Sequence, residues 1–576
     1  MNLTGAELII HLLERQGVRL VAGIPGGALL PLYEALGRSE RIRHVLARHE
    51  QAAGFMAQGM SRITGKAGVC FATSGPGVTN VVTALADAKL DSVALVCIAG
   101  QVPQHLIGTD AFQEVPTIDM VRPITKASFF VSCADELWQV IPEAFRIAET
   151  GRPGPVLVDV PKDVQLQITQ ETRLLPALHR TNQAGSSDCT SLYNHAAQLI
   201  AAAQRPVLYV GGGVVKARAH HLVRELAELT GIPVTTTLMA LGSLPVDHPL
   251  SLGMLGMHGA RSTNRVIDEC DLLIAVGARF DDRATGRTDR FASDAQVIHI
   301  DADARELGKI RQPTIAIRSD AHTALRELLA RARHHHRFAW LNRVRELKAA
   351  FPLLTPDDDQ ICSPYGIVRA VGELAPGDAI VTTDVGQHQM WVAQAYPFRR
   401  PDRWLTSGGL GTMGFGLPAA IGAALAEPAA TVICFTGDGS LLMNIQELAT
   451  LAELDLNVKI VLLDNASLGL VRQQQELFFS RRFVASLYAQ PSNFAAIARA
   501  FGIPALDLET SPAPYGALAR VLATDGPALV RVPIAAEHHV LPMVAPGAAN
   551  IDALDHPVNH PVDRPVAAPV CIESRS

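Results

Sequence analysis

The sequence predicts an α/β fold made of three doubly wound parallel-sheet domains. Runs of β-branched and other apolar residues, which are typical of buried strands, alternate with longer helical segments along almost the whole chain. A chain of 576 residues is also too long for one hydrophobic core, because a single domain usually holds about 100–200 residues. The 48% of hydrophobic and 18% of charged residues are typical of a compact globular protein.

The domain boundaries follow from where this alternation weakens. We expect a first domain at residues 1–170, a second at 190–340, a third at 360–545 and a weakly ordered tail at 547–576, which is rich in Pro and His. The expected strands are at 18–25, 42–48, 67–77, 92–100 and 154–161 in the first domain, 205–213, 271–280 and 295–303 in the second, and 379–386, 431–439, 458–465 and 527–534 in the third.

The N-terminus predicts an immediate helix. Thr4 and Glu7 have the spacing of a capping box, and an apolar run follows them. We therefore expect no signal peptide. The eight cysteines are scattered without a C-x-x-C pair, which favours a reducing, cytoplasmic setting.

One uncharged stretch, residues 404–426, could be taken for a membrane span. It holds six glycines and Pro418, so a buried strand, loop and helix are the better prediction. The net charge of −6 leaves no basic excess for nucleic acid or anionic lipid. A phosphate ligand must therefore be held by local dipoles or by a metal ion.

The most specific motif is Gly437-Asp438-Gly439-Ser440 at the end of one expected strand, with Asn465 at the end of the next. A bare G-D-G triplet also occurs in ordinary turns. In a parallel sheet, however, both strand ends open at the same carboxyl edge, where α/β sheets bind ligands. Magnesium takes oxygen ligands and shares them with phosphates, so the pair predicts a site for a diphosphate and Mg²⁺.

This pattern resembles the fingerprint of the thiamine-diphosphate enzymes. The resemblance implies that Asp438, Asn465 and the carbonyl of Ser467 bind Mg²⁺. It also implies contacts to the diphosphate from Val385, Gly386, Gln387, His388, Gly437, Gly439, Ser440, Ser467, Leu468 and Gly469. The family pattern usually ends in two asparagines; here the first is Asp464, which places an extra carboxylate beside the site.

Glu50 follows an expected strand and opens a helix of small, apolar residues. A lone glutamate at a helix start is usually only a favourable partner of the helix dipole. The surrounding segment, however, resembles the family's activating-glutamate segment, and the loop from Ser74 to Asn80, including Pro76, resembles its pyrimidine loop. The resemblance implies that Glu50 protonates the cofactor's pyrimidine ring, which makes residues 1–170 a pyrimidine-binding domain.

The segment from Gly408 to Gly414 resembles the loop that bends the cofactor, with Gly408, Gly409, Gly411 and Met413 beside it. Without the surrounding glycines, Met413 would be read as a core residue. In the family, the glutamate and the phosphate site come from different subunits. The resemblance therefore implies a homodimer or a larger oligomer.

The second domain resembles the FAD domain of acetohydroxyacid synthases. Three glycines after a strand and an acidic residue after a later strand suit a dinucleotide, although each alone could be an ordinary turn. The resemblance implies FAD contacts from Arg152, Gly211, Gly212, Gly213, Leu238, Met239, Leu255, Gly256, Met257, His258, Gly277, Arg279, Asp281, Asp301 and Asp320.

The same resemblance implies the activity. Pyruvate is decarboxylated on thiamine diphosphate, and the two-carbon unit is transferred to a second 2-oxo acid, the first common step of branched-chain amino-acid biosynthesis. Arg283 is implied to bind the acceptor carboxylate, where a guanidinium suits a planar anion. Gln113 and Lys126 line the site, and a regulatory small subunit is an expected partner. Many relatives have tryptophan where this chain has Gln474, which puts a preference for 2-oxobutyrate in doubt.

Three alternatives stay open at this point. A pyruvate oxidase-like enzyme or another thiamine-diphosphate carboligase or decarboxylase would share most of these motifs. Glyoxylate carboligase lacks the activating glutamate, so Glu50 speaks against it. A non-catalytic homologue would be expected to lose Glu50, Asp438 or Asn465, and all three are present.

Overall fold

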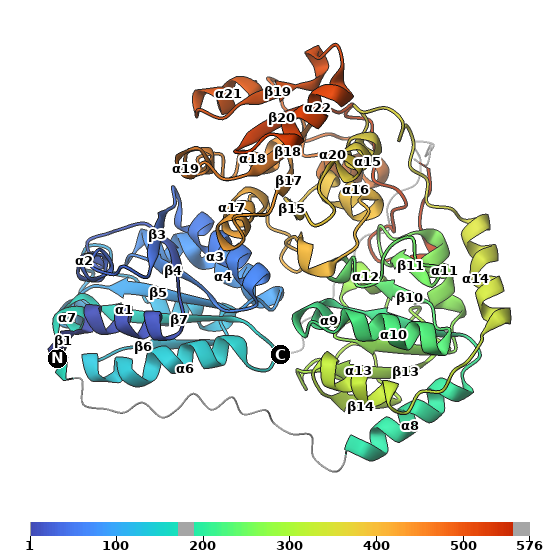
Figure 1. The fold of residues 1–576 in the computed structure, drawn as a ribbon, viewed down its shortest axis with the longest axis horizontal. Coiled ribbons are helices and arrows are strands. Elements are labelled where there is room, and N and C mark those ends of the chain that lie inside the picture. The colour runs from blue at the N-terminus through green and yellow to red at the C-terminus, as the bar shows by residue number, and fades with distance from the viewer. Residues whose placement is uncertain (1, 171–188, 557–576) are drawn as a thin grey trace.

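The computed structural model describes residues 2–170 and 189–556. These residues form three lobes, each built on a six-stranded parallel sheet with helices packed on both faces (Figure 1). The predicted fold class is therefore confirmed. Most of the sequence between the first and second expected domains, residues 171–188, lies outside the described residues, as does the expected tail from residue 557 onward.

The first lobe has the strand order β3-β2-β4-β5-β7-β6. Its strands are β2 (Leu20–Gly23), β3 (Arg43–Leu46), β4 (Gly68–Ala72), β5 (Leu95–Gln101), β6 (Ala127–Phe130) and β7 (Pro155–Pro161). Its helices are α1 (Gly5–Arg15), α2 (Leu30–Leu36), α3 (Glu50–Thr64), α4 (Pro76–Leu90), α5 (Thr117–Val121), α6 (Leu137–Glu149) and α7 (Lys162–Leu166). A short antiparallel pair joins β1 (Asn2–Thr4) to β8 (Ile168–Gln170).

The second lobe has the order β11-β10-β9-β12-β13-β14. Its strands are β9 (Pro206–Val210), β10 (Val234–Thr236), β11 (Ser251–Met254), β12 (Leu272–Val276), β13 (Gln296–Asp301) and β14 (Ile315–Arg318). Its helices are α8 (Cys189–Ala202), α9 (Gly212–Lys216), α10 (His220–Thr230), α11 (Arg261–Glu269), α12 (Asp282–Thr285), α13 (Ala321–Leu329) and α14 (Phe338–Ala350). Numbered along the lobe, this is the order 3-2-1-4-5-6 of dinucleotide-binding sheets.

The third lobe has the order β16-β15-β17-β18-β20-β19. Its strands are β15 (Ile380–Thr383), β16 (Trp404–Leu405), β17 (Val432–Gly437), β18 (Val458–Asp464), β19 (Ala505–Asp507) and β20 (Ala528–Pro533). Its helices are α15 (Pro364–Leu374), α16 (Gln387–Ala395), α17 (Gly416–Ala426), α18 (Asp438–Leu441), α19 (Glu447–Leu454), α20 (Gly469–Phe478), α21 (Phe494–Ala500) and α22 (Pro514–Ala523). The first and third lobes therefore share one topology, which differs from that of the second.

Several local predictions are confirmed. Thr4 and Glu7 form a capping box at the start of α1. The uncharged stretch 404–426 is a buried strand, a loop and the helix α17. No helix within residues 2–170 and 189–556 has the length and apolar character needed to cross a membrane. Residues 547–556 contact the second lobe, where Asn550 is buried and donates to the carbonyl of Ala284.

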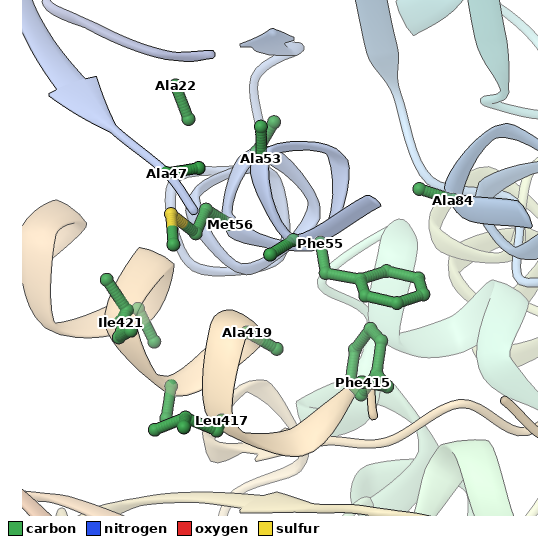
Figure 2. Packing of buried hydrophobic residues seen from close by; sticks show 14 of the residues in the cluster. Ala22, Ala47, Ala53, Phe55, Met56, Ala84, Phe415, Leu417, Ala419 and Ile421 are labelled. Carbon is green, nitrogen blue, oxygen red and sulfur yellow. The ribbon is translucent and has the colours of Figure 1, made fainter. Parts of the chain in front are cut away.

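The first and third lobes share one hydrophobic cluster, which is centred where α3 crosses α17 (Figure 2). Phe55 of α3 and Phe415, just before α17, meet edge to face with 5.4 Å between ring centroids. The helices touch backbone to backbone: a Cβ on Gly59 would lie 2.3 Å from the carbonyl oxygen of Ala419, and one on Gly422 would lie 2.0 Å from that of Met56. Small residues are therefore required at this crossing.

We expect Gly422→Ala to destabilise the protein by about 1–3 kcal/mol, because the added methyl group forces two packed backbones apart. The measurement is the free energy of unfolding in urea. Gly377→Ala is the matched control, since a Cβ there meets no atom within 4 Å. Equal stability of the two variants would contradict the close crossing.

Candidate active site

The G-D-G-S turn and the next strand end meet at the carboxyl edge of the third sheet. The two carboxylate oxygens of Asp438 accept from the backbone N–H groups of Gly439 (2.8 Å) and Ser467 (3.1 Å). Asn465 donates to Gln387 Oε1 (3.1 Å) and accepts from the hydroxyl of Ser467 (3.0 Å). The Ser440 hydroxyl donates to the carbonyl of Val385. Residues far apart in the sequence thus form one cluster between β15, β17 and β18.

The electrostatics of this cluster favour a bound cation. Burial, together with the neighbouring Asp464 carboxylate, raises the pKa of Asp438 to about 7. Asp464 is paired with Arg531 (2.7 Å), which also pairs with Asp507 and Glu509, so its negative charge is only partly offset. No three His, Cys, Asp or Glu side chains among the described residues are grouped for a metal ion. A hard cation here would instead use the Asp438 carboxylate, the Asn465 amide oxygen and the Ser467 carbonyl, an oxygen set that Mg²⁺ prefers.

Glycines at the same edge let the side chains of His388 and Gln387 pack directly against the backbone. A Cβ on Gly437 would lie 2.9 Å from His388 Nδ1, and one on Gly469 would lie 2.0 Å from Gln387 Oε1. His388 is buried, its pKa is lowered to about 3 by burial, and its Nε2 has no hydrogen-bond partner among the described residues. A buried polar atom without a partner is available to bind a ligand or a water. The residues therefore fit a diphosphate with its metal ion.

Glu50 lies at the first turn of α3 and is buried. Its Oε2 accepts from the Asn80 amide (2.9 Å), while Oε1 has no hydrogen bond within the described part of the chain. Ser74 is buried before α4, and Pro76 begins that helix. Gln113 lies against Gly75, where a Cβ would be 2.9 Å from its Cα. The predicted pyrimidine-side residues are thus brought together around α3 and α4.

The glycine-rich loop lies beside the phosphate cluster. Met413 is half-buried, and its terminal methyl lies 3.6 Å from where a Cβ on Gly439 would stand. Gly411 faces Val385. Asp384, which the motif analysis did not single out, anchors this loop: its Oδ1 accepts from the N–H groups of Gly414 (2.8 Å) and Gly416 (2.9 Å). A carboxylate at a strand end beside a recognised loop was the signal that could have found it.

In the second lobe, the strand ends of β9 and β12 meet at the point where strand order reverses. The N–H of Gly213 donates to Gly277 O (3.0 Å), and a Cβ on Gly211 would lie 2.2 Å from that oxygen. At the end of β10, the buried hydroxyls of Thr236 and Thr237 have no partner within the described residues. This crevice fits a dinucleotide, since α/β sheets bind such ligands at their switch points.

The remaining predicted flavin residues lie elsewhere in the second lobe, cap its helices or contact it from the first lobe. Met257 donates through its N–H to Arg283 O, and Arg283 is exposed beside Met257. Asp281 and Asp320 cap α12 and α13. The others belong to the same lobe: Gly212, Leu238, Met239, Leu255, Gly256, His258, Arg279 and Asp301. Of these, Arg279 donates to the carbonyl of Leu90 in the first lobe, and His258 lies beside the carbonyl of Pro542. Arg152 reaches across from the first lobe to Glu306 (2.6 Å).

Lys126 lies away from the residues around α3 and α4 and near the charged group of Arg152, Asp303 and Arg305. It precedes β6 and bonds to the start of β7, at the amino edge of the first sheet, whereas Ser74 follows the carboxyl end of β4. Its Nζ donates to the carbonyls of Ile147 and Thr150 at the end of α6 (2.5 Å each). Burial lowers the pKa of Lys126 to about 8. Within one chain, the structure does not bring Lys126 to Glu50 or Gln113.

Comparisons with known proteins agree with this arrangement. Three family models match: the N-terminal TPP binding domain of thiamine pyrophosphate enzymes over residues 3–120, their central domain over 193–328, and their C-terminal TPP binding domain over 384–532. The acetolactate synthase isozyme 1 large subunit of Escherichia coli is 55% identical over 95% of this chain and 97% of its own length. This chain belongs to the acetolactate synthase family.

Other members of the acetolactate synthase family match a similar share of this chain at lower identity. The isozyme 2 large subunit of Escherichia coli is 46% identical, covering 96% of this chain and all of its own length. A probable chloroplastic acetolactate synthase 2 of rice is 45% identical, covering 96% of this chain and 86% of its own length. These full-length matches favour this family over the pyruvate oxidase-like alternative.

We expect the magnesium affinity of the cluster of Asp438, Asn465 and Ser467 to depend on pH. Because the folded-state pKa of Asp438 is raised to about 7, a proton competes with the cation below that pH. Magnesium affinity in the presence of thiamine diphosphate should fall ~10-fold from about pH 8 to about pH 6, as one proton with that pKa requires. Titration calorimetry across this range measures it.

Two variants test whether Asp438 causes this fall in magnesium affinity. Asp464→Asn removes the negative charge next to Asp438, so the affinity should fall at a lower pH. Asp438→Ala should abolish magnesium-dependent retention of thiamine diphosphate while FAD stays bound. Affinity that is flat across the range, or retention that a chelator does not change, would contradict the site.

Proposed function

We propose that this chain is the catalytic subunit of an acetolactate synthase that uses thiamine diphosphate, Mg²⁺ and FAD. It decarboxylates pyruvate and transfers the two-carbon unit to pyruvate or 2-oxobutyrate. The observation that supports this most strongly is the full-length 55% identity to an acetolactate synthase large subunit, together with a cluster of Asp438, Asn465 and Ser467 that fits a metal-bound diphosphate.

Thiamine diphosphate would supply a carbon nucleophile that stabilises the charge left by decarboxylation. The chain's own residues hold it. Asp438, Asn465 and the Ser467 carbonyl would bind the metal ion, and the glycines beside His388 would admit the phosphates. Met413 would support the middle of the cofactor, since its thioether adapts to an irregular surface.

Glu50 would move the proton that activates the cofactor. Asn80 holds Oε2, which leaves Oε1 available to the pyrimidine ring. In a buried site, a carboxyl group can exchange a proton without competition from water. In this family arrangement Glu50 of one subunit faces the phosphate cluster of another, so we propose a homodimer or larger oligomer with the site at the interface, and a regulatory small subunit as a further partner.

The decisive experiment is incubation of the purified protein with pyruvate, thiamine diphosphate, Mg²⁺ and FAD, followed by assay for acetolactate. Formation of acetolactate without bleaching of the flavin under anaerobic conditions is the expected result. Flavin reduction by pyruvate with no acetolactate would instead identify an oxidase.

We expect Glu50→Gln to lower kcat by ~10²–10⁴-fold, the usual range for loss of acid–base help. The isosteric amide keeps an oxygen for Asn80 but cannot donate the proton. Cofactor affinity should change little, and deuterium exchange at C2 of bound thiamine diphosphate should slow with kcat. Exchange at the wild-type rate would show that Glu50 is not the activating acid.

A second prediction concerns Gln474. Its neighbours are engaged: Gln473 bonds to Gln387 and Val540, and Gln475 to Val484. Gln474 is half-buried, and its side chain makes no hydrogen bond within the described residues. Of the three glutamines, Gln474 is therefore the one whose side chain is free to contact an acceptor. Its amide is polar, whereas an apolar surface would favour 2-oxobutyrate, the longer acceptor.

The wild type should form acetolactate and acetohydroxybutyrate in near proportion to pyruvate and 2-oxobutyrate supplied. Gln474→Trp should shift the ratio toward acetohydroxybutyrate, because one methylene in an apolar pocket is worth ~1–3 kcal/mol, or about 10–200-fold. Gln474→Asn is the control and should leave the ratio unchanged. A strong wild-type preference for 2-oxobutyrate would show that residues other than Gln474 determine the choice of acceptor.

A further inference from the structure

Two aspartates near the end of α4 face the glycine-rich loop of the third lobe. Asp87 and Asp91 are one helical turn apart and both are buried. Neither belongs to the phosphate cluster or to the Glu50 wall. Their side chains leave the first lobe and bond to residues 407–412, just before Met413.

The carboxylate of Asp91 binds the backbone at the start of the loop. Its Oδ1 accepts from the N–H of Gly409 (2.7 Å), and its Oδ2 accepts from the N–H of Gly408 (3.1 Å) and from Arg62 (2.8 Å). Glycine is required here because a Cβ on Gly409 would lie 2.9 Å from Asp91 Oδ1. Both carboxylate oxygens are therefore used, each by an N–H donor.

Asp87 holds the end of the same loop. Its Oδ1 accepts from the hydroxyls of Ser407 and of Thr412 (3.0 Å), and Ser407 Oγ also accepts from the N–H of Thr412 (2.9 Å). Its Oδ2 has no hydrogen-bond partner among the described residues, with Arg62 at 3.9 Å. Asp87 thus uses one oxygen, whereas Asp91 uses two.

Arg62 connects these bonds to the helix that carries Glu50. It lies near the end of α3, donates to the carbonyl of Thr406 (3.1 Å), and its guanidinium stands 5.1 Å from the ring centroid of Phe415. One side chain thus touches both ends of the loop. Its charge is balanced by the buried aspartate pair.

The second lobe reaches the same point. Arg279 donates to the carbonyl of Leu90 (2.9 Å), and a Cβ on Gly408 would lie 2.2 Å from the sulfur of Met239. Arg152 donates to the Ser92 hydroxyl (2.8 Å). All three lobes therefore meet around the end of α4, with Asp91 at the centre.

We infer that Asp91 is a positioning residue for the reaction: it fixes the backbone of Gly408 and Gly409 and thereby the loop that carries Met413 toward the Gly437–Ser440 turn. The role of the loop rests on the proposed function. Through Asp91 and Arg62, the helices that carry Glu50 and the pyrimidine loop of one subunit also hold the loop beside that same subunit's phosphate cluster, whereas under the proposed function their Glu50 serves the site of the partner.

The test compares Asp91→Asn with Asp87→Asn. An amide at position 91 offers one acceptor where the loop and Arg62 need two, so it breaks the clamp. At position 87 an amide keeps the oxygen that both hydroxyls use and loses only the unpaired one. The two variants have the same size and the same loss of charge, which isolates the backbone bonds.

The first readout needs no cofactor: amide hydrogen exchange of the peptide spanning 406–415 in the apo protein. Exchange should be faster in Asp91→Asn and near wild type in Asp87→Asn. With Mg²⁺ and thiamine diphosphate, C2–deuterium exchange and kcat should fall together in Asp91→Asn, up to ~10²-fold for a misplacement near 1 Å. KM for pyruvate should change little.

Equal behaviour of the two variants, or an Asp91→Asn variant with wild-type exchange of both the 406–415 peptide and C2, would overturn the inference. If Asp91→Asn unfolds, Asp91→Glu decides, since it keeps the charge and both acceptor oxygens but moves them by one methylene from the N–H groups of Gly408 and Gly409: it should loosen the same peptide, and unchanged exchange there refutes the clamp. Because the peptide readout involves neither cofactor nor product, it stays informative even if the wild type makes no acetolactate.

Discussion

The close crossing of α3 and α17 is the constraint on which the rest of the structure depends. The backbones touch at Gly59 and Gly422, so the two helices have little freedom to slide. α3 begins at Glu50, and α17 follows directly on the loop that carries Met413. The crossing therefore fixes the first lobe's titratable group and the third lobe's phosphate edge relative to each other within one chain, and the buried Arg62–Asp91 pair reinforces it.

Near this crossing, individual neighbouring groups rather than a positively charged surface determine the charge of the site. The chain has no basic excess, and the phosphate edge presents backbone groups, an amide and a buried carboxylate rather than lysines. The second carboxylate, Asp464, pairs with Arg531, which also pairs with Asp507 and Glu509 and so offsets only part of its charge. The edge therefore stays negative, and a divalent cation would complement both it and a diphosphate. This arrangement makes binding depend on pH through Asp438.

Most of the fold could be predicted because buried parallel strands have a strong signature. Every expected strand is present. In the three large sheets, the strands that the pattern did not single out are β6, β10, β11, β14 and β19, of which all but β10 lie at sheet edges; the short pair of β1 and β8 was not expected either. They are short, and the edge strands have one unpaired side, so their residues need not be uniformly apolar; β14, for example, alternates buried and exposed residues. The site motifs were predictable for a related reason: Asp438, Asn465 and Glu50 each follow a recognisable strand.

What the sequence determined by itself is therefore local: strand ends, helix starts, and which polar side chain stands at each. These follow from periodicity and from the few residues that a tight turn allows. The tertiary structure decided which ends meet. It placed Lys126 at the opposite sheet edge from Ser74, although both lie in one domain, and it brought Asp91 to Gly408 across more than half the chain. Such contacts depend on how whole helices and sheets pack, and the packing of α3 on α17 is a property of surfaces that no single segment of the sequence contains.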